Sequence, residues 1–321
     1  VVTGVQTCAL PICGYKYLFG PVPSRRLGAS LGVSPIPERT CNYSCVYCQL
    51  GRTLRMTNTR QEFFPLEEIL AEFREYLQGS IPFDVVTVVG EGEPTLYSRL
   101  GELIAGLKKE TDKPVAVITN GALLYDAEMR RELMEADIVL PSLDAVTEEQ
   151  YRKIDRPMGS IGFAEMAEGL RQFAREYQGQ LWIEIMLVDG MNDSPEDIAA
   201  FKEFLGTIDY DRVCLNTPVR PPAEGFVHTS APERIDLAAR ELGGISIDQL
   251  TSGSFFSEVE DPYEAILSIA RRHPMNQFEV ESFLEAREIP ADQRQALMER
   301  LGQDTGITVV PYKGIITYRV N

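Results

Sequence analysis

Short apolar runs alternate with amphipathic segments between residues 27 and 219, and this alternation constrains the fold more than any other feature. The apolar runs are rich in Val and Ile and are apolar on both faces, as buried parallel strands are. The segments between them repeat apolar residues at helical spacing. Strands are predicted at 27–36, 83–90, 114–121, 137–144, 180–190 and 212–219. Helices are predicted at 65–79, 100–110, 126–136 and 194–208, with two more between residues 144 and 180.

Six β-then-α units in succession predict an α/β protein with a parallel sheet, either open and doubly wound or closed toward a barrel. In both architectures the functional side chains lie at the carboxyl ends of the strands. A polar or cysteine-rich segment follows each predicted strand in turn: TCNYSCVYC, GEGEP, TNG, SLD, DGMND and NTP. We therefore predict a partial (β/α)6 barrel, similar to a TIM barrel, at residues 14–230.

The remaining residues, 231–321, have a different pattern. Helical segments, one of them ending in RRH at 271–273 where cations complement the helix dipole, precede ITVVPYKGIITYRV. That last segment predicts a β-hairpin around Lys313 and Gly314, and helices followed by a hairpin predict a small winged-helix-like accessory domain. Residues 261–321 hold nine acidic and seven basic residues, which favours a packing or partner-docking domain over a DNA-binding one.

Residues 1–13 are set apart from both domains. They contain no initiator methionine, basic flank or clear small-residue cleavage site. The stretch VVTGVQTCALPIC resembles translated sequencing-adapter read-through. We therefore predict a non-native leader and leave Cys8 and Cys13 out of the site.

The composition limits the partners. The formal net charge is −17, and a field of that sign repels nucleic-acid backbones and anionic membranes. No apolar run approaches the roughly 20 residues that cross a bilayer. Six cysteines in 321 residues do not form a disulfide scaffold and suit a reducing compartment, where clustered thiols serve metal or redox chemistry. We expect a cytoplasmic protein that does not associate with membranes.

Three of the cysteines, Cys41, Cys45 and Cys48, lie within eight residues after the first predicted strand. Structural zinc is held by four protein ligands, yet the next candidate, Cys214, lies in a predicted strand, and neither histidine is paired with a cysteine. Thiolates favour iron–sulfur clusters or zinc, and an iron–sulfur cluster normally takes four cysteines. Three ligands therefore predict an open site, such as a [4Fe–4S] cluster with one iron free.

The spacing C-x3-C-x2-C, with Tyr47 before the last cysteine, resembles the cluster loop of the radical S-adenosylmethionine (SAM) superfamily. GEGEPTL at 90–96 resembles the GGEP motif of that superfamily, with Glu91 in place of its first glycine. TNG, SLD and NTP fall where the superfamily forms its SAM pocket. The resemblance covers about residues 15–225. FGPVPSRRLGASLGV at 19–33 also resembles the Fe–S oxidoreductases related to wyosine-type tRNA-modifying enzymes.

The resemblance implies an enzyme with two cofactors, a [4Fe–4S] cluster and SAM. In that superfamily the open iron chelates the amino and carboxylate groups of SAM. One electron, from a donor such as flavodoxin or ferredoxin, then cleaves a carbon–sulfur bond. The resulting 5′-deoxyadenosyl radical abstracts hydrogen from a substrate, here unknown: a small molecule, a protein or RNA. Only Cys214 remains outside the loop and the leader, which disfavours a second cysteine-held cluster.

The same resemblance assigns roles to the residues of the cysteine loop. Cys41, Cys45 and Cys48 are expected to be the metal ligands and the catalytic residues. Tyr47 is expected to pack against the cluster or near the adenine of SAM.

The GEGEP stretch is expected to form part of the SAM site. Gly90 and Gly92 allow a close approach of the backbone to the ligand, and Pro94 stiffens the turn. Glu93 or the adjacent backbone faces the ammonium group of SAM, which favours a charge-assisted hydrogen bond. Ser142 and Asp144 share one strand face and are predicted to reach the ribose. The further cofactor-binding candidates are Glu91, Asn120, Glu184, Asn192 and Asn216.

Other interpretations of these residues stay open. GEGEPTL is also typical of a β-to-α turn. Asp144 is a candidate cap for a helix that begins near Thr147, and Asn192 a candidate turn residue. Arg25 and Arg26 are candidates for contacting a substrate anion or the SAM carboxylate, with a solvated pair as the default prediction. The alternative function is a metal-stabilised binding protein, holding zinc or an iron–sulfur cluster, that docks nucleic acid or a protein partner through its C-terminal domain without catalysis.

Overall fold

The computed structural model describes residues 15–24, 26–79, 81–246, 255, 257, 259–312 and 314–321. The predicted leader with Cys8 and Cys13, the predicted partner Arg25, and Lys313 at the tip of the predicted hairpin lie outside these described residues. Within them, no helix is long and apolar enough to cross a membrane.

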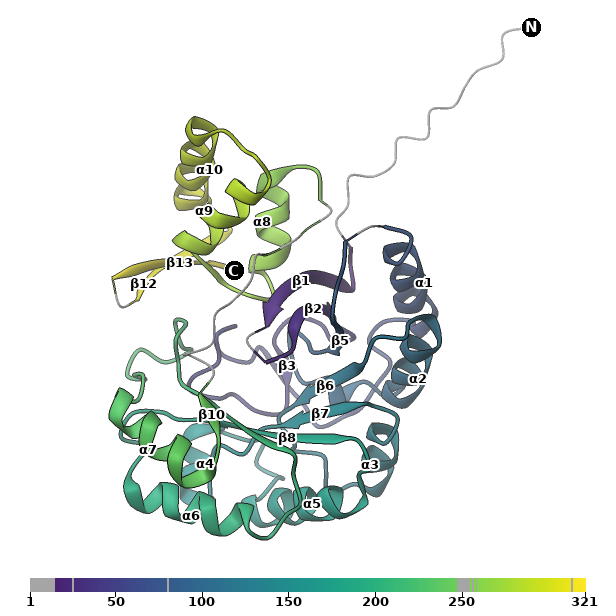
Figure 1. The fold of residues 1–321 in the computed structure, drawn as a ribbon, viewed down its shortest axis with the longest axis vertical. Coiled ribbons are helices and arrows are strands. Elements are labelled where there is room, and N and C mark those ends of the chain that lie inside the picture. Colours follow the sequence, from purple (N-terminus) through teal and green to yellow (C-terminus); the bar gives the residue numbers. More distant parts are fainter. Residues whose placement is uncertain are drawn as a thin grey trace, which may run out of the picture.

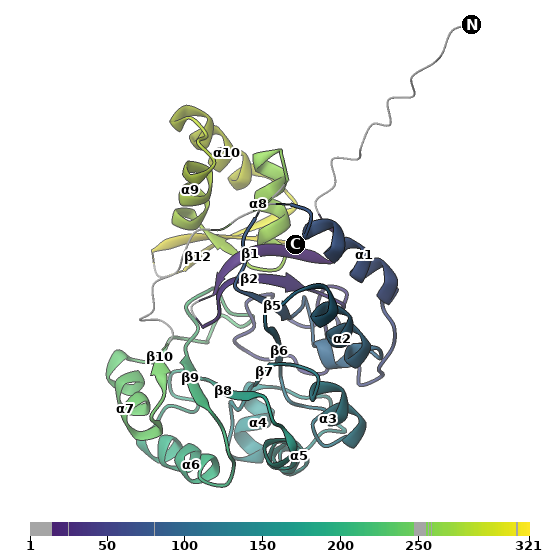
Figure 2. The same cartoon turned by 45° about the vertical axis from the view of Figure 1, so that its right-hand side comes forward.

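An eight-stranded sheet forms the centre of the larger part of the molecule (Figure 1). Its order is β1-β2-β5-β6-β7-β8-β9-β10, and every neighbouring pair is parallel except β1 and β2. The strands are β1 (Leu18–Ser24), β2 (Gly28–Val33), β5 (Val85–Val88), β6 (Val115–Thr119), β7 (Ile138–Pro141), β8 (Gln180–Met186), β9 (Arg212–Asn216) and β10 (Ile245–Ser246). The sheet curls, and its helices lie along the outer side (Figures 1 and 2), which confirms the predicted partial barrel.

The helices follow the predicted segments with trimmed ends. They are α1 (Leu66–Tyr76), α2 (Leu100–Glu110), α3 (Ala127–Leu133), α4 (Glu148–Ile154), α5 (Phe163–Glu176) and α6 (Pro195–Leu205). The short 3-10 helix η1 (Pro94–Leu96) and the helix α7 (Pro232–Leu242) lie outside the predicted helical segments. Helix α6 begins where the sequence predicts, because Ser194 and Asp197 exchange hydrogen bonds in a capping box.

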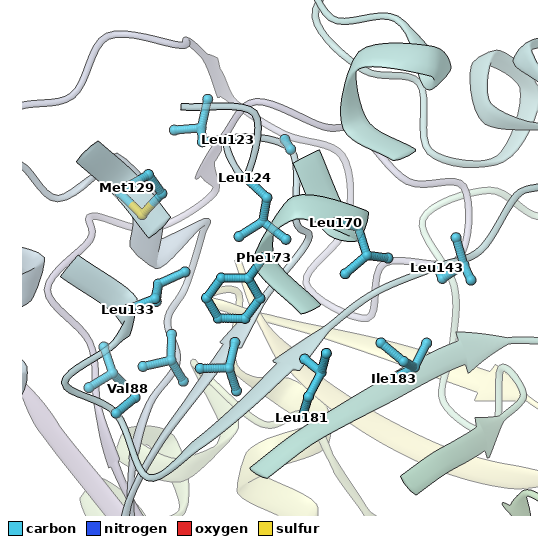
Figure 3. Packing of buried hydrophobic residues seen from close by; sticks show 14 of the residues in the cluster. Val88, Leu123, Leu124, Met129, Leu133, Leu143, Leu170, Phe173, Leu181 and Ile183 are labelled. Atoms are coloured by element: carbon cyan, nitrogen blue, oxygen red, sulfur yellow. The ribbon is translucent and has the colours of Figure 1, made fainter. Parts of the chain in front are cut away.

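Apolar side chains of the helices and of the outer sheet face form one core. Figure 3 shows Phe173 of α5 among Leu133 of α3, Leu170 of α5 and Leu181 of β8. Phe173 is completely buried. Truncating such a side chain typically costs about 3–5 kcal/mol, so this layer holds the strands, and therefore their carboxyl ends, in fixed positions.

Two strands of the eight-stranded sheet, β1 and β10, were absent from the prediction. The sequence of β1 contains two prolines and a glycine, which is typical of a turn. The strand forms because it lies at the edge of the sheet, where proline is tolerated. β10 follows α7 and pairs in parallel with β9, with Ile245 opposite Cys214. The sheet therefore continues past residue 230, where the sequence placed the end of the barrel.

The C-terminal residues form a smaller module with its own core. Helices α8 (Pro262–Ala270), α9 (Gln277–Ala286) and α10 (Ala291–Gln303) accompany a sheet of order β11-β13-β12. Its strands are β11 (Met275–Asn276), β12 (Ile307–Tyr312) and β13 (Ile315–Val320). Tyr263, Phe283 and Leu284 are buried at its centre. Figures 1 and 2 both place α8 beside β1, so the module lies against the sheet edge.

Candidate active site

The cysteine loop is fixed by a two-stranded ladder and by backbone hydrogen bonds. β3 (Thr40–Cys41) pairs in parallel with β4 (Arg55–Met56). The Val46 N–H donates to the Ile154 carbonyl at the end of α4 (2.9 Å). The Cys48 N–H donates to the Cys45 carbonyl (3.1 Å). The loop thus turns tightly between its cysteines, on a rigid base.

The GEGEP turn lies directly against the start of this loop. The Glu93 N–H donates to the Thr40 carbonyl (3.0 Å), and the Arg39 N–H donates to the Glu91 carbonyl (2.5 Å). A Cβ added at Gly92 would lie 1.8 Å from the Thr40 carbonyl oxygen, so only glycine allows this approach. The two motifs that carry the resemblance are therefore brought together at Cys41.

Glu93 stabilises the strand ends through its buried carboxylate. Oε1 accepts from the Thr95 N–H (3.0 Å), the Thr95 hydroxyl (2.6 Å) and the Thr119 hydroxyl (2.6 Å). Oε2 accepts from the Asn120 N–H (2.8 Å). Burial raises the pKa of Glu93, and these hydrogen bonds oppose the shift. The carboxylate links the end of β5 to the end of β6, which makes the adjacent backbone the better placed of the two predicted SAM contacts.

Asn120 bridges the same region to the cysteine loop. Its Nδ2 donates to Asn42 Oδ1 (2.7 Å) and contacts Cys41 Sγ (3.6 Å). Its Oδ1 accepts from the Ala122 N–H (2.9 Å). Asn120 therefore orients the Cys41 thiol.

One cavity of about 440 Å³ adjoins the three cysteines. Its lining includes Cys41, Cys45, Cys48, Tyr47, Gly90, Glu91, Gly92, Ser142, Asp144, Glu184 and Asn216. Four predicted residues, Glu93, Pro94, Asn120 and Asn192, are not part of this lining. Most of the predicted site residues thus line one cavity, and the other four lie behind this lining.

Tyr47 and Asp144 form a pair at one side of the cavity. The Tyr47 hydroxyl donates to Asp144 Oδ2, and the Met186 N–H donates to Oδ1 (2.7 Å). Burial raises the pKa of Asp144 to about 6, against the effect of these hydrogen bonds. Asp144 is not the cap of α4, because the Thr147 side chain caps that helix by accepting from Gln150.

Glu184 of β8 is one of the residues that line the cavity. Its carboxylate forms an ion pair with Arg26 and accepts from Asn216 Nδ2 (3.2 Å). Arg26 is therefore one of the residues that line the cavity, and the prediction that it is solvated is wrong. A charge at position 184 is tolerated here because it is paired.

The Asn192 side chain forms hydrogen bonds with the backbone and does not line the cavity. Its Oδ1 accepts from the Val188 N–H (2.8 Å), and its Nδ2 donates to the carbonyls of Asp144 and Met186 (2.8 Å each). These three hydrogen bonds use most of its bonding capacity. The geometry therefore fits the alternative interpretation of Asn192 as a turn residue.

Several residues beside the cysteines carry no local signal in the sequence. Asp155 Oδ1 lies 3.8 Å from Cys45 Sγ. Burial raises the pKa of the Cys48 thiol, and the charges of Arg319 and Arg39 lower it. Asp155 and Arg319 come from distant parts of the chain, and only the folded structure brings them to the cysteines.

The C-terminal module contributes to the same cavity. Phe255, Arg272, His273 and Glu279 are part of its lining. Arg272 Nε lies 3.6 Å from Glu91 Oε2, and both side chains are mostly buried. The helix-end interpretation of RRH is incomplete, because α8 ends at Ala270 and Arg272 reaches the cavity.

The donor set fits an iron–sulfur cluster. The three loop cysteines form no disulfide and line one cavity, whereas Cys214 is buried in β9 outside it. Across the described ranges, no three His, Cys, Asp or Glu side chains converge on a point as ligands of a single ion do. A cubane binds each thiolate to a different iron, so its ligands are spread more widely.

A family model decides the identity. The model described as the Radical SAM superfamily matches residues 36–202. The chain belongs to the radical SAM superfamily. Radical SAM enzymes use a [4Fe–4S] cluster and SAM, and this chain is therefore an enzyme of that type.

Individual relatives of this radical SAM protein cover it to different extents. The UPF0026 protein MJ1312 of Methanocaldococcus jannaschii is 32% identical over 94% of this chain and 95% of that protein. The protein named GTPase Obg of Brachyspira hyodysenteriae is 43% identical over 64% of this chain, which spans only 30% of that protein. A crystal structure of a radical SAM methyltransferase from Sphaerobacter thermophilus shares the fold, with a TM-score of 0.52 and 18% identity over 68% of each chain.

Proposed function

We propose that this radical SAM enzyme cleaves SAM reductively to methionine and a 5′-deoxyadenosyl radical, which takes hydrogen from a substrate. The observation that carries the proposal is the single cavity lined by Cys41, Cys45, Cys48 and the GEGEP turn. When bound, the cluster supplies the electron and an open iron for SAM. The protein contributes position, charge and exclusion of water.

The proposed roles of the side chains follow from their contacts. Cys41, Cys45 and Cys48 hold the cluster, and Asn120 fixes Cys41 from behind. The Gly90–Gly92 backbone is open to the cavity for the ammonium end of SAM. Ser142 and Asp144 line the same cavity and are the proposed contacts of the ribose hydroxyl groups, and Glu184 lines it while paired with Arg26. Asn192 and Pro94 support the turns that carry these groups.

The substrate class stays open among a small molecule, a protein and RNA. The relationship to wyosine-type tRNA-modifying enzymes stays a prediction from residues 19–33, and the net charge of −17 works against RNA. A cytoplasmic location and an external electron donor belong to the same proposal. Comparing metabolites and tRNA modifications between a knockout strain and its parent would identify the class.

Anaerobic reconstitution tests the chemistry. The protein is loaded with iron and sulfide, reduced with dithionite and given SAM, and 5′-deoxyadenosine and methionine are measured by mass spectrometry. We expect both products in equal amounts from the native chain and neither from Cys45→Ser. A loaded cluster that never cleaves SAM would refute the proposal. Stoichiometric zinc in place of iron, with no SAM binding, would instead support the non-enzymatic alternative.

A further inference from the structure

The last strand of the C-terminal module, β13, brings an arginine to the cysteine loop. Arg319 Nη1 lies 3.5 Å from the position that a Cβ would take at Gly51, and Arg39 Nη1 lies 3.7 Å from it. The Gly51 N–H donates to the Cys48 carbonyl (3.1 Å), so Gly51 belongs to the turn that carries the last loop cysteine. Two guanidinium groups, one from the barrel and one from the module, therefore lie beside this turn.

Of these two arginines, Arg39 is paired with a carboxylate and Arg319 is not. Arg39 Nε lies 3.1 Å from Glu38 Oε1, which offsets its charge. Arg319 Nη2 donates to the Pro221 carbonyl (2.7 Å), which holds the side chain in place. Its Nε is buried without a hydrogen-bond partner, and within the described part of the chain Arg319 forms no ion pair with a carboxylate. Because a charge withdrawn from water is costly unless it is paired, we expect a negative charge beside Arg319.

The cysteine loop supplies this negative charge when its cofactor is bound. Cysteine binds metals as the negatively charged thiolate, so the ligands of a cluster bring negative charge to the turn. Burial lowers the pKa of Arg319, the charge of Cys48 raises it, and the charge of Arg39 lowers it further. Cys48 and Arg319 are thus close enough for their charges to interact.

The Arg319 guanidinium acts on the loop and not on a molecule inside the cavity. The loop residues Cys48, Gln49, Leu50 and Gly51 line the cavity, whereas Arg319 is not part of this lining. Its contacts with Pro221 and with the turn at Gly51 hold it outside the space left for SAM and the substrate. A charge at that place influences the cofactor through the electric field, which is weakly screened where water is excluded.

We propose that Arg319 raises the reduction potential of the cluster held by the loop cysteines. The inference rests on the proposed function, in which Cys41, Cys45 and Cys48 are the cluster ligands. Reduction adds one electron and no proton to the cluster, so the negative charge beside Arg319 increases. A fixed cation stabilises the more negative state, and net charge is one of the factors that set the potential of an iron–sulfur cluster. The C-terminal module thereby makes the cluster easier to reduce.

The midpoint potential of the reconstituted cluster, titrated without SAM and followed by electron paramagnetic resonance, tests this role. Arg319→Gln removes the charge. We expect its equilibrium constant for one-electron reduction to fall about tenfold, which lowers the potential by about 59 mV. Arg319→Lys keeps the charge and should keep a potential close to that of the native chain. Arg300→Gln is the matched control, because it removes an exposed charge from α10 of the same module, away from the cavity lining.

A second variant changes the same charge while Arg319 stays in place, and it decides the matter if Arg319→Gln fails to assemble a cluster. Thr308 of β12 is exposed and lies opposite Arg319 in the β12–β13 register. Opposite residues of an antiparallel pair share one face, so Thr308→Glu places a carboxylate next to the guanidinium. The potential should fall in this variant too. Thr308→Gln adds no charge and should keep the native potential.

The possible outcomes separate this inference from the proposed function. Equal potentials in the native chain, Arg319→Gln and Thr308→Glu would overturn the role of Arg319, and so would an equal fall in Arg300→Gln. An unchanged potential with weaker SAM binding in Arg319→Gln would place the arginine in the SAM site and would also overturn the proposal. If the native cluster is reduced but never cleaves SAM, the proposed function fails, while a lower potential in Arg319→Gln still supports the inference.

Discussion

The cysteine loop and the C-terminal module both line one cavity, but only the sequence of the loop indicates this role. The loop carries its three thiols within eight residues, and their spacing predicts the chemistry when it is taken together with the GEGEP, TNG, SLD and NTP motifs. The module reaches the cavity through Arg272 and its neighbours, which no local pattern identifies. The residues that hold a cofactor must be close together in space, so they are often close together in sequence as well. The other residues that line a cavity can come from any segment that the fold brings near.

The contact between Glu91 and Arg272 joins the two regions. Glu91 stands where the superfamily motif has glycine, and it faces the arginine of the module across 3.6 Å. A departure from the motif is thus matched by a contact from outside the barrel. We infer that the module is part of the active-site structure and not a separate attachment.

The largest effect is expected when a cysteine of the loop is replaced. Cys45→Ser replaces a thiolate with a poor ligand for iron, so we expect loss of the cluster and of all SAM cleavage. Iron and sulfide content measured after reconstitution checks this. Cys214→Ser is the control and should retain the full cluster, because Cys214 is outside the cavity. Equal loss in both variants would show that the chemistry is not confined to the loop.

A smaller effect is expected where the two motifs touch. In Gly92→Ala the new Cβ would lie 1.8 Å from the Thr40 carbonyl oxygen. Overpacking of this kind costs about 1–3 kcal/mol, and it should displace Cys41 enough to lower iron loading. Gly159→Ala, with nothing within 4 Å of the new Cβ, is the control. Thermal unfolding and iron content measure both effects. Native loading in Gly92→Ala would separate the GEGEP turn from the cluster site.

The smallest expected effect tests the contact between the regions. Arg272→Gln, Glu91→Gln and the double variant form a thermodynamic cycle. The side chains are 9% and 13% exposed, so we expect a coupling free energy of about 1 kcal/mol in urea unfolding. The affinity for SAM should change in the single variants. Purely additive effects would mean that the module does not stabilise the cavity through this pair.

The sequence predicted the parts of the fold that depend on local pattern. All six predicted strands and the predicted helices are present, because buried parallel strands and amphipathic helices have distinct periods. Strand β1 escaped prediction because its prolines suit an edge strand as well as a turn. The roles of Arg26 and Asn192 depend on partners from other strands. Burial and pairing at such positions arise only when the sheet has formed.

The state of the iron tests the central claim most directly. The protein is reconstituted with 57Fe, and its Mössbauer spectrum is recorded before and after SAM is added. A cluster held by three cysteines predicts four irons per chain in roughly a 3:1 ratio, with SAM changing the signal of the single iron. Four equivalent irons that do not respond to SAM would contradict an open site formed by Cys41, Cys45 and Cys48.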